Sequence, residues 1–120
     1  MRIGKIARLT GLTISKLRYY EKHGLIRVAR DKNGLRNYAE DDIAWIKFIQ
    51  RLKDTGMLIR DIKKYAELRY NGDLTIPERL EMLQVHRQYV LKQQQKWQDY
   101  LQNLDDKIEI YKSKLNEVNI

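Results

Sequence analysis

The sequence predicts a mainly α-helical fold, in which two short helices, a two-stranded hairpin and two further helices precede one long C-terminal helix. Two observations predict this order. Apolar residues recur at steps of three and four along most of the chain, and glycines divide only its first 72 residues into short segments. We therefore expect a domain over residues 1–70, a linker over 71–76 and a helix over 77–120.

A helix, a tight turn and a second helix open the chain. Residues 3–9 predict a short helix, and TGLT at 10–13 predicts a turn in which Gly11 adopts a positive φ. Thr13 is a favourable N-cap for a second helix that ends near His23, where Gly24 is the expected C′ residue. The apolar faces are expected to comprise Ile3, Ile6 and Leu9 in the first helix, and Ile14, Leu17 and Tyr20 in the second. This order is that of a helix-turn-helix unit.

A hairpin follows directly. Ile26 and Val28 have strand spacing, KNG at 32–34 is a turn signal, and residues 35–38 supply the returning strand. A basic two-stranded hairpin after a helix-turn-helix predicts a wing, so the expected fold is a winged helix-turn-helix domain.

Two helices complete the predicted domain, over residues 41–55 and 59–70. The first has its apolar residues at helical spacing and ends at Gly56. The expected buried faces comprise Trp45, Phe48, Ile49 and Leu52 in the first helix, and Ile62, Tyr65, Ala66 and Arg69 in the second. The polar stretch RYNGDLT then predicts the linker.

The long helix is predicted to begin at TIPE, where Thr75 and Glu78 fit a capping box and Pro77 suits the first turn. Its length is roughly 58 Å at about 1.5 Å per residue. One stripe runs along it: Leu80, Leu83, Arg87, Val90, Gln94, Trp97, Leu101, Leu104, Ile108, Tyr111, Leu115 and Val118. A lone helix cannot bury such a stripe, so we favour self-association over folding back onto the domain.

Charge is concentrated in the predicted domain. Residues 1–70 hold 17 Lys and Arg against 8 Asp and Glu, whereas residues 71–120 hold 7 against 8. A local positive potential attracts polyanions. Nucleic acid is the first candidate, an anionic membrane surface the second, and a merely solvated basic face the alternative.

Several classes are disfavoured by composition. The chain has no cysteine, which excludes disulfides and thiolate metal sites. We find no leader-like segment and no apolar run near the ~20 residues that span a bilayer, and we expect a cytoplasmic protein without a membrane partner. Catalytic constellations, metal-ligand clusters and phosphate loops are also missing from the sequence, so we expect neither an enzyme nor a cofactor.

Three segments together resemble the MerR family of bacterial transcription regulators. They are MRIGKIARLTGLTISKLRYYEKHGLI at the start, KNGLRNYAEDD at the hairpin and FIQRLKDTGMLIRDIKK in the next helix pair. The resemblance extends over essentially the whole chain. The chain is similar to short members of the family, which lack an appended effector domain. It departs from the family pattern at Leu35, where a tyrosine is usual, and at Ala39 and Ile59, where a capping Ser or Thr is usual.

The resemblance implies a homodimer with an antiparallel coiled coil that binds a pseudo-palindromic promoter site. In the family, an effector makes the dimer bend and untwist DNA, which acts on RNA polymerase indirectly. Two alternatives remain: an architectural or excisionase-like DNA-bending protein without an effector, and a coiled-coil interaction protein whose basic head binds acidic protein or lipid.

The expected DNA contacts combine residue chemistry with this resemblance. On the second helix and its cap they are Thr13, Ser15, Lys16, Arg18 and Tyr19; on the wing, Asn33, Arg36 and Tyr38; and beyond it, Lys53 and Arg60. Arg18 is the strongest candidate for a bidentate contact, with an intrachain pair to Glu21 as its alternative. For Arg60 the alternative is a solvated side chain.

An effector, if one binds, is expected where residues 62–90 of one protomer meet the other. The candidate lining residues are Tyr65, Tyr70, His86, Tyr89 and Trp97. We favour the alternative that these are ordinary core and coiled-coil residues.

Overall fold

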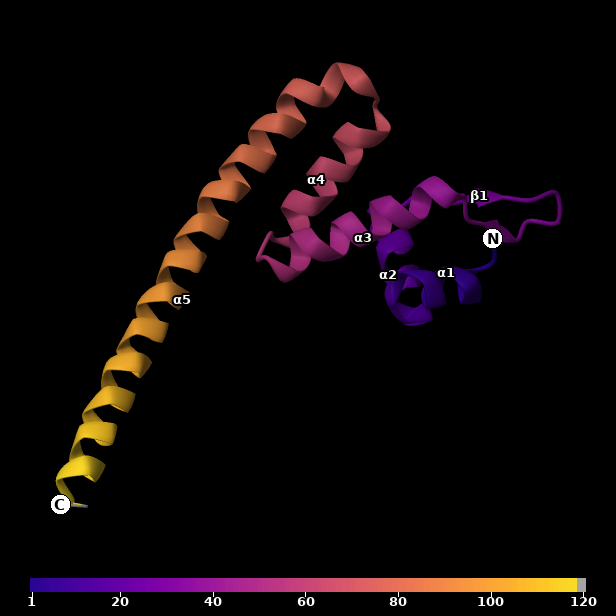
Figure 1. The fold of residues 1–120 in the computed structure, drawn as a ribbon. Helices are drawn as coiled ribbons and strands as arrows, with labels where there is room; N and C mark the ends of the chain where they lie inside the picture. The colour runs from indigo at the N-terminus through magenta and orange to yellow at the C-terminus, as the bar shows by residue number, and fades with distance from the viewer. Residues whose placement is uncertain (119–120) are drawn as a thin grey trace. The chain divides into compact units, whose positions relative to one another are not determined.

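The computed structural model describes residues 1–118, as helices with one two-stranded hairpin (Figure 1). The chain divides into two compact units, Met1–Leu83 and the remainder from Gln84. We call residues 1–83 the head. Residues 119 and 120, the end of the predicted long helix, lie outside the described part. The predicted fold class, a winged helix-turn-helix followed by a long helix, is confirmed.

The first two helices form as expected. Helix α1 spans Ile3–Thr10 and α2 spans Ile14–Lys22, with Gly11 between them at a φ of 75°. The hydroxyl of Thr13 accepts a hydrogen bond from the backbone N–H of Lys16 at 3.1 Å, which confirms the predicted N-cap.

The predicted apolar faces of α1 and α2 are wrong at two positions. Ile6, Leu17 and Tyr20 are buried, but Leu9 and Ile14 are 44% and 40% exposed. Both exposed residues lie at the helix ends that flank the turn between the two helices. Helical spacing identifies an apolar face, but not how far along the helix the core extends.

The hairpin is shorter and starts later than predicted. Strand β1 is Ala29–Arg30 and pairs antiparallel with β2, Arg36–Asn37. Ile26 is buried and precedes the strand, because the amides of Leu25 and Ile26 donate to the carbonyl of Tyr20 at the end of α2. These amides are therefore committed to the helix end and are unavailable to a sheet.

Helix α3, Glu40–Asp54, and helix α4, Ile59–Tyr70, agree with the predicted ranges to within one residue. Ile46 of α3 is also buried, which the predicted face omitted. Ala39 offers α3 no side-chain cap, as the sequence indicated, but the Asp42 carboxylate accepts the Ala39 N–H at 2.8 Å. For α4 the N-cap is Leu58, one residue before the predicted Ile59.

The hydrophobic core of the head gathers side chains from α1, α2, α3, α4 and the segments around the hairpin. Its buried residues are Ile6, Leu17, Tyr20, Leu25, Ile26, Tyr38, Trp45, Ile46, Ile49, Leu52, Ile62, Tyr65 and Ala66. Met82 and Leu83 of the last helix also pack against it. The predicted core residue Phe48 is half-buried at its edge.

A short 3-10 helix, η1 at Asp73–Thr75, leads into the last helix. In place of the expected capping box, the Thr75 hydroxyl donates to the carbonyls of Leu68 and Gly72 and accepts from Arg79 Nε at 3.0 Å. The Thr75 side chain thus joins the end of α4 to the start of the last helix. The predicted domain division at 71–76 stays a prediction.

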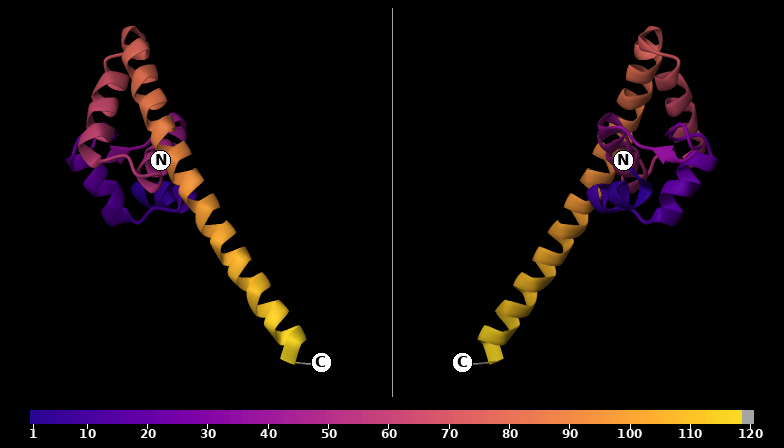
Figure 2. Two further views of the ribbon diagram at one scale, coloured as in Figure 1. Left: turned by 90° about the vertical axis from the view of Figure 1, so that its left-hand side faces the viewer. Right: turned by 90° about the vertical axis from the view of Figure 1, so that its right-hand side faces the viewer.

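Helix α5 spans Ile76–Val118 without interruption, 43 residues in all (Figure 2). No residue of α5 is buried within the described chain. Of the predicted stripe, Trp97 is 71% and Leu104 61% exposed. The helix predicted from sequence is therefore present, and Leu83 is the member of its stripe that packs against the core of the head.

Candidate nucleic-acid interface

The start and outer face of α2 carry an exposed set of polar and cationic groups. Thr13, Ser15, Arg18 and Tyr19 are exposed, and Lys16 is half-buried. Within residues 1–118, the side chain of Arg18 has no hydrogen bond or ion pair. All five guanidinium donors are thus available to a base edge or a phosphate.

The alternative reading of Arg18, a pair with Glu21, is wrong. The Glu21 carboxylate pairs instead with two arginines of the hairpin, Arg30 and Arg36. Tyr19 has a ring partner on its own helix, since its centroid lies 4.2 Å from that of His23. This contact restricts the Tyr19 ring while leaving the residue 42% exposed.

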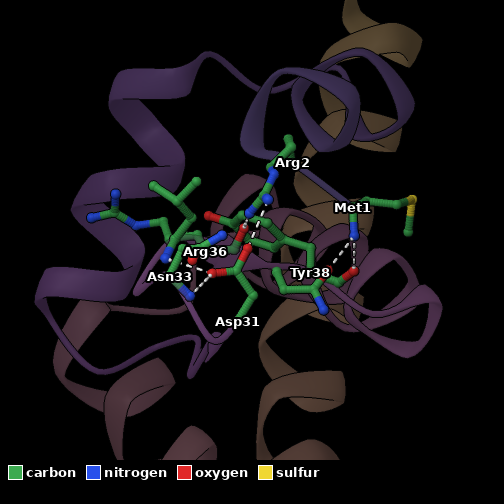
Figure 3. Close-up of polar contacts among 8 residues, drawn as sticks. Met1, Arg2, Asp31, Asn33, Arg36 and Tyr38 are labelled. Carbon is green, nitrogen blue, oxygen red and sulfur yellow. Dashed lines mark hydrogen bonds and ion pairs between the residues drawn. The ribbon is translucent and has the colours of Figure 1, made fainter.

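The hairpin turn is anchored by Asp31 (Figure 3). Its Oδ1 accepts the N–H groups of Asn33 and Leu35 at 2.9 and 3.0 Å, and its Oδ2 accepts from Arg2 Nη2 at 2.7 Å. The Arg2 hydrogen bond, followed by the Leu35 N–H, holds the pKa of Asp31 below its ordinary value. The exposed side chain of Asn33 lies in this anchored turn, where it can reach a flanking phosphate.

Arg36 is less free than the sequence indicated. Its Nε donates to Glu21, which raises the pKa of the guanidinium, and its carbonyl accepts from Arg2 Nη1 at 3.0 Å. The side chain remains 34% exposed. A phosphate contact by Arg36 must therefore use the guanidinium donors that Glu21 does not occupy.

The predicted contact by Tyr38 is wrong. Its side chain is 2% exposed, within the core of the head. Burial, more than the nearby Glu21 charge, raises the pKa of the phenol, and the hydroxyl has no hydrogen-bond partner among the described residues. Tyr38 directly follows β2, and its backbone is hydrogen-bonded to Met1 while its ring packs into the core.

Two further cations lie outside the helix-turn-helix and the wing. Lys53 is half-buried near the end of α3, and Arg60 is in the first turn of α4 with its side chain 81% exposed. Arg60 Nε lies 3.9 Å from Asp61 Oδ1, a long and exposed contact that contributes little. The DNA contacts predicted for Lys53 and Arg60 stay predictions.

Sequence reasoning missed the residues that hold the wing in place. Arg2 and Glu21 connect the wing to α1 and α2, and Arg30 is the second partner of Glu21. A signal was present: Glu21 is the only acidic residue among the first 30, and two arginines of the hairpin follow it. An isolated carboxylate in so basic a segment indicates an ion pair.

Of the candidate effector residues, Tyr65 and Tyr70 lie in the packing of the head. The Tyr65 ring stacks on Trp45 at 5.8 Å, and the Tyr70 hydroxyl accepts the N–H of Arg27 at 3.0 Å. Arg69 lies over the Trp45 ring at 4.4 Å. For these two tyrosines, the structure favours the core interpretation.

The remaining three candidates lie on α5. His86 and Tyr89 have ring centroids 6.0 Å apart, and Trp97 makes an edge contact with Tyr100. These contacts are local to the helix. A pocket formed with a second protomer stays a prediction.

Within residues 1–118, no group of three or more acidic or histidine residues is placed to hold a metal ion. No helix of this described part is long and apolar enough to span a membrane.

An exposed cationic helix within a helix-turn-helix, flanked by an anchored basic hairpin, defines the class of winged helix-turn-helix DNA-binding proteins. The family described as "MerR HTH family regulatory protein" matches residues 1–68, and the family described as "MerR, DNA binding" matches residues 43–107. The chain belongs to the MerR family of DNA-binding transcription regulators.

Relatives and solved structures agree. An uncharacterised HTH-type transcriptional regulator of Haemophilus influenzae is 38% identical over 108 residues, which cover 89% of this chain and 80% of that protein. The regulator AdhR of Bacillus subtilis is 40% identical over 93 residues, 77% of this chain and 66% of its own length.

Two solved structures are similar over nearly the whole chain. HiNmlR, described as a MerR family regulator lacking the sensor domain and bound to promoter DNA, has a TM-score of 0.83 at 36% identity, and the match covers 93% of this chain and 90% of that one. A MerR family regulator of Listeria monocytogenes has a TM-score of 0.92 at 28% identity, with 99% and 91% covered.

Proposed function

We propose that the chain regulates transcription as a homodimer in which α5 pairs antiparallel with its copy. The exposed stripe of α5 carries this proposal. Leu101, Leu104 and Ile108 are each about half exposed or more, at 51%, 61% and 48%, and are spaced as one face of a coiled coil. Full burial of an exposed apolar side chain contributes about 1.5–3 kcal/mol. Because these side chains are about half exposed, each has roughly half of that still to gain, which favours pairing of two copies.

Each head then binds one half of a pseudo-palindromic promoter site. The N-terminal end of α2 enters the major groove, where Arg18 takes a base edge or a phosphate and Thr13 and Ser15 lie beside the backbone. Tyr19, Asn33 and Lys53 contact phosphates around it, and Lys16, Arg36 and Arg60 add positive charge. Half-sites one turn of DNA or a multiple apart, about 34 Å or more, require two heads held at a set separation.

Regulation through DNA shape completes the proposal. HiNmlR, which is similar over nearly the whole chain, is described as bound to promoter DNA. We infer that the dimer bends and untwists its site in response to a small-molecule effector and so acts on RNA polymerase indirectly. Bending draws on sequence-dependent deformability.

The DNA-contact assignment is tested by comparing Arg18→Ala with Lys53→Ala. The probes are a duplex selected by the wild-type chain from a randomised pool and a scrambled duplex of equal length and composition. Arg18→Ala should cost about 1–3 kcal/mol on the selected duplex and less on the scrambled one, whereas Lys53→Ala should weaken both alike. Equal losses on both duplexes for both variants would contradict the assignment.

The regulatory part is tested separately. Fluorophores at the two ends of the selected duplex report its bending by energy transfer, with and without a panel of metabolites. A metabolite that changes the transfer efficiency supports the effector mechanism. Bending that no metabolite alters supports the alternative, an architectural or excisionase-like protein.

A further inference from the structure

The wing is too short to hold its own position. Strands β1 and β2 contribute two residues each, at 29–30 and 36–37, and even much longer isolated hairpins are marginal in water. Its orientation therefore depends on contacts with other elements. The N-terminal ammonium of Met1 donates to Asn37 Oδ1 and to the carbonyl of Tyr38, and Arg2 donates to Asp31 and to the carbonyl of Arg36. Glu21 supplies the contact that joins the wing to α2.

Glu21 bridges both strands from the last turn of α2. Its Oε1 accepts from Arg30 Nη2 at 2.9 Å, and its Oε2 accepts from Arg36 Nε. Arg30 and Arg36 face each other in the strand register. The Glu21 carboxylate thus connects α2, the helix that carries Arg18, to two arginines that face each other across the hairpin.

The two arginines are only partly satisfied by this contact. The Glu21 side chain is 16% exposed, whereas those of Arg30 and Arg36 are 44% and 34% exposed. Because Glu21 is largely shielded from water, its attraction to both cations is screened less by salt than that of an exposed pair. Without its charge, two mobile cations would lie beside the DNA-binding helix.

We propose that Glu21 is a positioning residue that sets sequence specificity through Arg30 and Arg36. It holds the wing at one orientation relative to α2, so that wing cations reach phosphates only when α2 is in its correct register on the DNA. This inference rests on the proposed function, in which α2 and the wing contact one duplex.

Loss of the Glu21 charge should affect binding to cognate and to non-cognate DNA differently. A cation that is free of Glu21 binds phosphate on any sequence, and each further phosphate contact adds to affinity and to its salt dependence. Loss of the Glu21 charge therefore strengthens binding to non-cognate DNA while it loosens the geometry on cognate DNA. A residue that only supported the fold would weaken both when removed.

The test compares Glu21→Gln with Glu67→Gln, which makes the same change of charge at an exposed residue of α4 outside the interface. The full chain is titrated with the selected and scrambled duplexes at several salt concentrations. For Glu21→Gln we expect scrambled-duplex affinity to rise about threefold or more and the ratio of the two affinities to fall about tenfold. The slope of log affinity against log salt should steepen by roughly 1–2; Glu67→Gln should change the ratio little.

Glu21→Asp provides the rescue, because it keeps the charge with a shorter reach and should restore part of the ratio. Thermal unfolding of each variant checks that it is folded at the measuring temperature. If Glu21→Gln is not folded there, Glu21→Asp replaces it in the comparison of the two duplexes. An unchanged ratio, or equal losses on both duplexes with an unaltered salt slope, would overturn the proposal. Failure of the proposed function would appear before any variant is compared, because the wild-type chain would then enrich no duplex from the randomised pool.

Discussion

The head and the part of α5 beyond residue 83 differ in the burial of their apolar side chains. The head buries Ile6, Ile49 and the rest of its core behind neighbouring helices, whereas α5 buries none of its residues within the described chain. In globular proteins most helical stability comes from packing of an apolar face. The head supplies that packing itself, whereas the apolar stripe of α5 is the surface that the proposed dimer would bury.

Their polar contacts differ in the same way. In the head, hydrogen bonds join separate elements: the Tyr20 hydroxyl donates to Gln50, and Trp45 Nε1 donates to the carbonyl of Leu25. Along α5, Gln95 donates to Asp99 and Gln102 donates to Asp106, which are contacts between residues four positions apart on one helix.

The largest expected effect comes from a charge on the α5 stripe. Leu104→Asp should weaken self-association by about 3–5 kcal/mol, a hundredfold or more, because an unpaired carboxylate would lie in the seam. Asn103→Asp adds the same charge one residue away, off the stripe, and should have a small effect. Sedimentation equilibrium measures both. Equal association of the two variants would show that the stripe is not the contact surface.

A smaller loss is expected from the core of the head. Ile49 is fully buried, so Ile49→Ala should lower the free energy of unfolding by about 3 kcal/mol. Ile110 of α5 is 49% exposed and lies off the predicted stripe, so Ile110→Ala should stay within about 0.5 kcal/mol of wild type. Urea denaturation monitored by far-UV circular dichroism reports the helices of both regions. Similar costs at both sites would remove the contrast between the two regions.

The smallest effect concerns two tyrosine hydroxyls of the head. The Tyr20 hydroxyl donates to Gln50 at 3.0 Å, whereas that of Tyr38 is buried without a partner among the described residues. Tyr20→Phe should cost about 1 kcal/mol, while Tyr38→Phe should be neutral or slightly stabilising. Both are measured by thermal unfolding. A loss in Tyr38→Phe as large as in Tyr20→Phe would show that its hydroxyl is hydrogen-bonded in solution.

Local signals were predictable wherever the physical cause is local. The Thr13 cap and the left-handed glycine at 11 follow from properties of a few adjacent residues, and both formed as expected. The exposed Arg18 was found from its place on an amphipathic helix. Predictions failed where a distant element decided the outcome, as for Thr75, whose hydroxyl bonds back to α4.

The sequence alone determined the order and type of the helices, the concentration of positive charge before residue 71 and the continuous stripe of α5, because periodicity, glycine conformation and charge need no knowledge of distant neighbours. Only the tertiary structure decided that Tyr38 turns into the core, that Ile14 stays outside it and that Glu21 holds Arg30 and Arg36. The physical reason is that burial and ion pairing depend on which elements pack together. A strand of two residues has too few positions to show its alternation in sequence, and an ion pair between residues 21 and 36 exists only once the hairpin folds back onto α2.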